Sequence, residues 1–126
     1  MNREIKFRGK SLNTGLWSYG DLRQDNIRRK AYIEYEADPE TIGQFTELTD
    51  CKGKEIYEGD ILSFTVFDAF GGDRQHRGTV RYCGSRFMIW LSLDGDVCLD
   101  LDWVIEQDDE LEIIGNINDN PELTKQ

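Results

Sequence analysis

Apolar and polar residues alternate along much of the chain, and this period of two predicts strands rather than helices. Near the start, Ile5 and Phe7 share one face of a short predicted strand whose other face is charged. The turn residues Asn13–Gly15 and the aromatic run GLWSYGDL come next and together indicate a hairpin. The run KAYIEYEA at residues 30–37 is again rich in β-prone residues. The N-terminal third is therefore predicted to consist of strands.

One short helical turn is predicted directly after these strands. Asp38 suits the N-cap, Pro39 the first helical position and Glu40 the first turn. Gly43 should keep this turn short.

The second half of the chain reads as a meander of five strands, at residues 60–67, 79–84, 86–93, 97–105 and 111–117. A loop rich in glycine and charge, residues 70–78, is expected to be the most mobile interior segment. A three-residue loop, DGD, would place Ile89 opposite Leu101 and bury the apolar sides of two strands together. Short strands with Gly- and Asp-rich turns suggest a small SH3-like or related β-barrel.

At 126 residues the chain is predicted to form a single domain. Its expected parts are an N-terminal β-rich lobe with the helical turn (1–58), the small barrel (59–118) and a tail (119–126) that frays or forms one helical turn. A chain of this length buries roughly two-thirds of the surface that its unfolded form exposes, so it can fold without disulfides or metals.

Charge is divided unevenly along the chain, whose net charge is −10. Residues 1–35 hold eight Lys/Arg against four Asp/Glu, whereas residues 86–126 hold two against eleven. An acidic surface repels phosphates, so general nucleic-acid binding is disfavoured. The three cysteines, Cys51, Cys83 and Cys98, form no CxxC pair, which favours a reducing compartment. The longest apolar run, FMIWL, is far too short to span a bilayer, and the chain reads as soluble and cytoplasmic.

The stretch TDCKGKEIYEGDIL, Thr49–Leu62, is the most distinctive candidate for chemistry. A phosphate loop needs a second glycine at fixed spacing, a Ser/Thr after the lysine and a helix behind it. Lys54 is followed by glutamate, and a strand follows Gly59. The segment is therefore interpreted as two turns around a short extended piece, with Glu58 and Asp60 as turn carboxylates.

Other candidate sites lack a complete pattern. The acidic run from Asp94 to Asp102 fails the calcium-loop spacing, which would require Gly at the position of Leu99. His76 is the only histidine, and no nucleophile-elbow sequence accompanies it. No catalytic, cofactor or metal residues are predicted, although the many carboxylates leave a hydrolase open.

Basic and aromatic residues are interleaved in the first third of the chain. Lys6 and Arg8 flank Phe7, and Trp17 and Tyr19 follow on the second arm of the hairpin. Such a set can form a surface for single-stranded nucleic acid. Alternating aromatic residues are more often core, so this remains an alternative.

Three stretches carry a resemblance to a known family. REIKFRGKSLNTGLWSYGDL at the start, DPETIGQFTELTDCKGKEIYEGDIL in the middle and EIIGNINDNPEL near the end resemble the YopX family of phage and prophage proteins. The resemblance spans nearly the whole chain and implies a small, largely β protein working inside the bacterial host. It brings no established catalytic residues or cofactor. One departure is Glu47, where the family pattern usually has the glycine that a left-handed turn would favour.

The leading hypothesis is a non-enzymatic protein-binding module that docks on a host or phage protein. The alternatives are a nucleic-acid-associated factor that uses the N-terminal third and, less favoured, a carboxylate hydrolase. A homo-oligomer is also expected, in which the basic N-terminal region meets an acidic surface of the next subunit. The expected docking surface comprises aromatic and charged residues of the family stretches: Trp17, Tyr19, Lys54, Tyr57 and Glu58.

Overall fold

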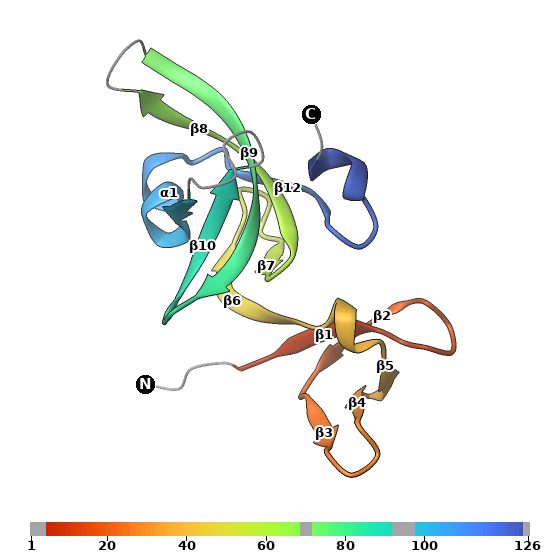
Figure 1. Cartoon of the computed structure of the whole chain (residues 1–126). Helices are drawn as coiled ribbons and strands as arrows, with labels where there is room; N and C mark the ends of the chain where they lie inside the picture. The colour runs from red at the N-terminus through yellow and green to blue at the C-terminus, as the bar shows by residue number, and fades with distance from the viewer. Residues whose placement is uncertain (1–4, 69–71, 92–97, 125–126) are drawn as a thin grey trace. The chain divides into compact units, whose positions relative to one another are not determined.

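The computed structural model describes residues 5–68, 72–91 and 98–124 (Figure 1). Antiparallel strands make up most of it, which confirms the prediction of a mainly β protein. The chain divides into two compact units, unit 1 (Met1–Glu47) and unit 2 (Leu48–Gln126), whereas the sequence suggested lobes meeting after residue 58. No helix among the described residues has the length and apolar character needed to cross a bilayer.

Unit 1 contains two small antiparallel sheets. Its elements are β1 (Phe7–Lys10), β2 (Trp17–Gly20), β3 (Arg23–Asp25), β4 (Lys30–Ile33), β5 (Tyr35–Ala37), the 3₁₀ turn η1 (Pro39–Thr41) and the start of β6 (Gly43–Thr49). β1 pairs with β2 and with β6, and β4 lies between β3 and β5. A methyl group on Gly9 would lie only 3.1 Å from Ile33 Cδ1 and 3.3 Å from Ala37 Cβ, so β1 packs closely on β4 and β5.

Two local predictions for unit 1 are confirmed. β1 and β2 form the expected hairpin, with Gly15 in the left-handed region of its loop (φ 73°). Asp38 caps η1, and its carboxylate accepts a hydrogen bond from the Glu40 N–H at 3.1 Å.

Unit 2 is built around a five-stranded antiparallel sheet in the order β11-β10-β9-β8-β12. Its further elements are β7 (Glu55–Tyr57), β8 (Asp60–Asp68), β9 (Gly72–Cys83), β10 (Arg86–Leu91), β11 (Cys98–Asp100), α1 (Leu101–Gln107), β12 (Glu112–Asn116) and the 3₁₀ turn η2 (Pro121–Thr124). For the tail, where either fraying or one helical turn was expected, the structure has the turn η2. One face of the sheet and α1 supply most of the core, to which β7 adds Ile56. The core includes Ile56, Leu62, Phe64, Val80, Ile89, Leu101, Val104 and Leu111.

The predicted SH3-like barrel is not confirmed. The sheet of unit 2 is open among the residues that the structure describes, with β11 and β12 at its two edges. Leu101 and Val104 of α1 are fully buried against it. A helix therefore covers part of the apolar face that barrel closure would otherwise have to bury.

The strand predicted for residues 97–105 is wrong beyond Asp100. Asp100 is the N-cap of α1, and its carboxylate accepts from the Asp102 N–H at 3.0 Å. Leu101 and Val104, three residues apart, point into the core, while Trp103 between them is exposed. The strand pairing also differs from the expectation by two residues, because Ile89 pairs with Leu99 rather than Leu101. A shift of two keeps the same side chains on the same face. The predicted DGD loop lies outside the described residues.

The loop predicted for residues 70–78 is instead a strand from Gly72 onward. β9 pairs with β8 from Gly72 to Thr79. Within this stretch, Phe64 lies opposite His76 and Val66 lies opposite Arg74. The ring centroids of Phe64 and His76 are 5.8 Å apart. Pairing with a long apolar strand overrides the polar composition of this segment. Residues 69–71 lie outside the part that the structure describes.

Glu47 adopts the left-handed conformation (φ 72°) although it is not glycine. This conformation costs an L-residue about 1–2 kcal/mol, whereas glycine adopts it freely and loses about 0.5–1 kcal/mol of chain entropy on folding. We expect Glu47→Gly to be more stable than Glu47→Ala by about 1 kcal/mol. Both variants lose the same side chain, so their difference isolates the backbone. Equal midpoints of urea unfolding for the two variants would contradict a strained Glu47.

Gly78 faces a crowded point between β9 and β10. A methyl group there would overlap Ile89 Cγ2 and lie 2.8 Å from the Trp90 carbonyl oxygen. Gly78→Ala should therefore lower the free energy of unfolding by about 1–3 kcal/mol, the usual cost of overpacking. Arg81→Ala, at an exposed position of the same strand, is the control and should stay within about 0.5 kcal/mol of wild type. If Gly78→Ala were as stable as this control, β9 and β10 would accommodate the methyl group without loss of stability, which would contradict the prediction.

Candidate functional site

The segment Thr49–Leu62 is organised by the carboxylate of Asp50, whose side chain is buried. Oδ1 accepts hydrogen bonds from the Lys52 and Lys54 N–H groups, both at 2.9 Å. Oδ2 accepts from the Ile113 N–H at 3.1 Å, which ties the turn to β12. The backbone donors that a phosphate would need are thus used within unit 2, which agrees with the interpretation of this segment as a turn.

These donors also set the ionisation of Asp50. Burial alone would raise the pKa of this carboxyl group, but the hydrogen bonds from Ile113, Lys54 and Lys52, with the Lys54 charge, together lower its pKa below the usual value. Asp50 is therefore a carboxylate at neutral pH.

A second carboxylate fixes the other turn of the segment. Asp60 is buried, and its Oδ2 accepts from the Tyr57 N–H at 2.8 Å. Gly59, with φ 95°, donates to the Val80 carbonyl oxygen and accepts from the Ile117 N–H. The segment therefore connects β9 to the chain after β12. These contacts give it a structural role in unit 2.

The structure assigns the five residues of the predicted docking surface to both units. Trp17 and Tyr19 lie on β2 of unit 1, half-buried and exposed respectively. In unit 2, Lys54 is exposed, Glu58 is half-buried and Tyr57 is only 2% exposed. The Tyr57 hydroxyl group bonds to Glu55 Oε1 at 3.1 Å. Trp17 and Tyr19 share one strand face, and their use in docking remains a proposal.

That face of the β1–β2 hairpin combines cations and aromatic rings. Arg8 lies opposite Tyr19 and Lys10 opposite Trp17, so all four side chains belong to the same face. The Arg8 guanidinium lies 4.6 Å and the Lys10 ammonium group 5.4 Å from the centre of the Trp17 ring. Both distances are typical of cation–π interactions, so the two cations hold the Trp17 ring in place.

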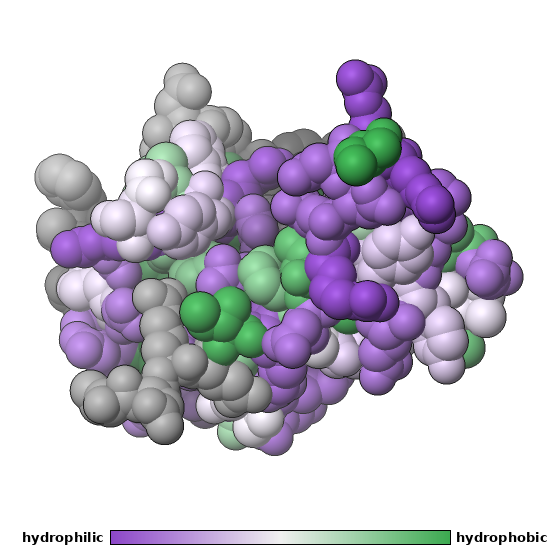
Figure 2. All heavy atoms as spheres, turned by 90° about the horizontal axis from the view of Figure 1, so that it is seen from below, coloured by the Kyte–Doolittle hydropathy of each residue, from purple (hydrophilic) through white to green (hydrophobic). Residues whose placement is uncertain are grey.

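Unit 1 also exposes large apolar side chains. Six of the nine exposed large hydrophobic residues in the described part of the chain belong to it: Ile5, Leu12, Leu16, Tyr19, Ile27 and Tyr35. Its buried apolar side chains are Ala31, Ile33, Ala37 and Phe45. The face seen in Figure 2 is mostly hydrophilic with separate hydrophobic spots. On this face, exposed apolar groups therefore occur as separate spots rather than as one continuous patch.

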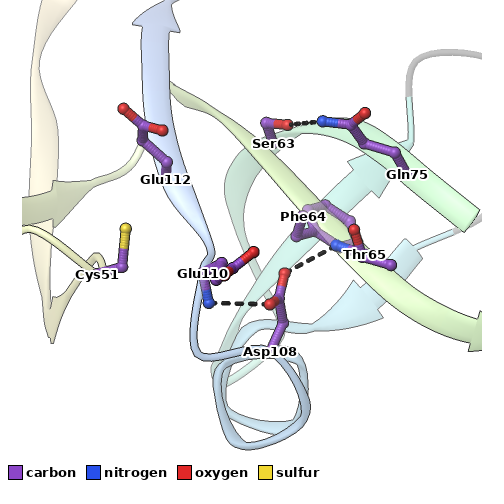
Figure 3. A pocket seen from close by; sticks show the side chains of 8 residues that line it. All are labelled: Cys51, Ser63, Phe64, Thr65, Gln75, Asp108, Glu110 and Glu112. Carbon is purple, nitrogen blue, oxygen red and sulfur yellow. Dashed lines mark hydrogen bonds between the residues drawn. The ribbon is translucent and has the colours of Figure 1, made fainter. Parts of the chain in front are cut away.

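Unit 2 has a hollow of about 360 Å³ beside β8 and β12 (Figure 3). Asp108 forms one wall, where its carboxylate accepts from the Thr65 N–H at 2.8 Å and the Glu110 N–H at 2.9 Å. Glu112 forms an ion pair with Lys52 at 2.7 Å, and this contact raises the pKa of Lys52. The residues that line the hollow are Cys51, Ser63, Phe64, Thr65, Gln75, Asp108, Glu110 and Glu112.

The acidic residues that line this hollow do not form a metal site. The structure, within its described ranges, has no group of three or more Asp, Glu, His or Cys side chains placed to hold a metal ion. Asp100, from the acidic run noted above, is paired with Arg86 at 2.7 Å. Its hydrogen bond with Arg86 lowers the pKa of Asp100. Asp94 and Asp96 lie outside the described residues.

A smaller hollow of about 180 Å³ lies at the end of α1 and shares Cys51 and Asp108 with the first. Ile105 and Leu111 contribute apolar surface, and Asp109 is exposed at its margin. Neither Ile105 nor Asp109 is a candidate site residue on the basis of the sequence. One sequence signal could have indicated the helix beside this hollow: after Asp100 the apolar residues Leu101, Val104 and Ile105 have helical rather than strand spacing.

Comparisons with known proteins identify the family and the fold. The family described as "YopX protein" matches residues 6–125. A crystal structure of protein EF1440 from Enterococcus faecalis is similar, with a TM-score of 0.60 and 21% sequence identity over 98% of this chain and 100% of that one. At this identity the similarity concerns the fold alone. No curated protein matches the sequence.

Loss of the Asp50 charge should destabilise unit 2. At pH 7, Asp50→Asn keeps the shape but weakens three hydrogen bonds, and we expect a loss of about 1–3 kcal/mol in the free energy of unfolding. Because folding lowers the pKa of Asp50, its stabilisation is present above the unfolded pKa of about 3.9 and is lost as the pH falls through the folded pKa.

The difference between wild type and Asp50→Asn should therefore shrink below about pH 4, as measured by urea unfolding at a series of pH values. Asp109→Asn, at an exposed position, is the control and at pH 7 should stay within about 0.5 kcal/mol of wild type. A difference independent of pH would mean that the charge of Asp50 contributes nothing.

Proposed function

This chain belongs to the YopX family, and from that premise we propose that it is a non-enzymatic protein-binding module of a phage or prophage that acts in the cytoplasm of the bacterial host. Unit 1 is its docking part and unit 2 the better-packed support. The partner is a host or phage protein.

The proposal rests on the ratio of exposed to buried apolar side chains in unit 1. This unit exposes six large hydrophobic side chains and buries only four apolar ones among its described residues. Scattered exposed hydrophobic residues are normal on a surface, but their concentration in so small a unit is typical of one that gains apolar contacts from a partner. Leu12 and Leu16 are 55% and 69% exposed on one hairpin loop. The Leu12 N–H donates to the Glu36 carbonyl oxygen, which holds this loop against β5.

Charge favours a protein partner. Unit 1 holds eight Lys/Arg and eight Asp/Glu, so its formal net charge is zero, and unit 2 accounts for the whole −10. A unit with no net charge repels partners of neither sign, and its projecting aromatic groups belong to the residue class that is enriched in protein interfaces.

One observation favours a second candidate, single-stranded nucleic acid. Lys6, directly before β1, and Arg8 and Lys10 within β1 alternate on the face that holds Trp17, and Lys6 lies 5.0 Å from the centre of the Phe45 ring. Cations beside aromatic rings on a sheet are the usual components of such binding surfaces. The acidic total charge opposes it.

Capture from phage-infected host lysate, with and without nuclease, tests the function. We expect one protein to bind the immobilised chain in both conditions, and Leu12→Ser/Leu16→Ser to reduce its recovery at least about tenfold, the effect of losing central apolar contacts. Trp103→Ser/Ile114→Ser removes exposed apolar groups of unit 2 and is the matched control.

Equal capture by both double variants would contradict docking through unit 1. Recovery that disappears with nuclease would overturn the protein-binding proposal and support the second candidate. Recovery of no specific protein would also contradict it.

A further inference from the structure

The turn between β3 and β4 presents one aliphatic side chain almost completely to solvent. Ile27 is 95% exposed, the highest value among the exposed large hydrophobic residues of the described chain. Asp25 Oδ1 accepts from the Ile27 and Arg28 N–H groups, both at 3.1 Å. These bonds fix the backbone of the turn, so Ile27 is held outward at little further cost in entropy.

Three cations follow Ile27 directly. Arg28, Arg29 and Lys30 are all exposed, and Arg29 has φ 56°. Arg28 Nε lies 3.9 Å from Asp25, and Lys30 Nζ 3.7 Å from Glu36. Both pairs are long and at least partly exposed, so solvent screens them and the turn keeps much of its positive potential. We call residues 25–30 the basic tip.

The smaller hollow of unit 2 has the complementary properties. Its volume of about 180 Å³ is several times the roughly 30 Å³ that one water occupies in the liquid, so an aliphatic side chain fits. Ile105 is half-buried and Leu111 2% exposed, which gives it an apolar floor. Asp109 lies at its margin and Glu110 follows, both exposed. We call this site the acidic hollow.

We propose that the basic tip of one copy of this chain inserts Ile27 into the acidic hollow of a second copy. Arg28 and Arg29 of the first copy then face Asp109 and Glu110 of the second. The aliphatic contact supplies the affinity, and the charges fix orientation and exclude wrong partners.

Charge complementarity selects a second copy as the occupant. The tip belongs to a neutral unit and carries three adjacent cations, while the hollow belongs to the unit that carries the net charge of −10. Every copy supplies both surfaces, so they are always present in equal amounts. The two surfaces differ, so the contact is head to tail and repeats from copy to copy as a ring or a chain.

This contact goes beyond the proposed function and does not depend on it. A chain that binds no other protein still carries both surfaces, and the proposed docking loop at Leu12 and Leu16 is not part of either.

Sedimentation velocity with a concentration and salt series tests the proposal on the full chain. Wild type should associate at micromolar concentration in low salt and dissociate partly in high salt. Ile27→Ser should raise the dissociation constant at least about tenfold. Arg81→Glu, an exposed charge reversal on β9, should associate like wild type.

Two charge-reversed variants give a specific rescue. Arg28→Glu/Arg29→Glu has an acidic tip and an acidic hollow, and Asp109→Lys/Glu110→Lys has a basic tip and a basic hollow. Each alone should be monomeric, with an unchanged circular dichroism spectrum. Mixed in equal amounts they should associate, because each surface then meets its opposite charge.

A wild type that stays monomeric at tens of micromolar in low salt would overturn the proposal. So would assembly that persists in both reversed variants, or a mixture that stays monomeric. These outcomes concern only self-association, and the lysate capture described above reports separately on the proposed function.

Discussion

The fold of unit 2 depends on the buried carboxylate of Asp50. One side chain closes the turn after β6 and holds the N–H of Ile113 in β12, a residue far along the chain. Burying a carboxylate is costly unless hydrogen bonds compensate for the lost water, and three backbone donors do so here. The sheet edge at β12 is thus joined to the most distinctive stretch of the sequence. This explains why that stretch combines charge with glycine although the Lys52 and Lys54 N–H groups are already bonded to Asp50.

The sequence was sufficient where one local signal acted alone. The Asp38-Pro39-Glu40 cap and the hairpin at Gly15 depend on neighbouring residues only, and both are present. The prediction from sequence failed where the same residues fit both the strand period and the helix period. Residues 97–105 alternate like a strand, yet Leu101 and Val104 also have helical spacing, and the Asp100 cap decides for the helix. The polar run of β9 is a strand because β8 pairs with it, which composition cannot show.

The candidate sites follow the same division. The aromatic and basic face of the first hairpin could be anticipated, since alternation places Trp17 and Tyr19 together. The burial of Tyr57 could not, because it depends on how the turn at Asp60 folds back. The smaller hollow of unit 2 joins residues 49–51 with residues 105–111, and the long-range hydrogen bond from the Ile113 N–H to Asp50 ties these two parts of the chain together. Local pattern therefore predicted which side chains are available, and long-range hydrogen bonds determined which of them meet.

The hydrogen bond from the Thr65 N–H to Asp108 has a consequence for aggregation. β12 pairs with β8 only as far as Ser63, so the next outward-facing donor of β8 lies beyond the end of its neighbour. An unpaired strand edge is a template on which strands of other molecules can add. Asp108 occupies that donor and places a negative charge beside it, both of which discourage such addition. A change at Asp108 would therefore be expected to appear as insoluble protein during expression, beyond any loss of thermal stability in the purified molecule.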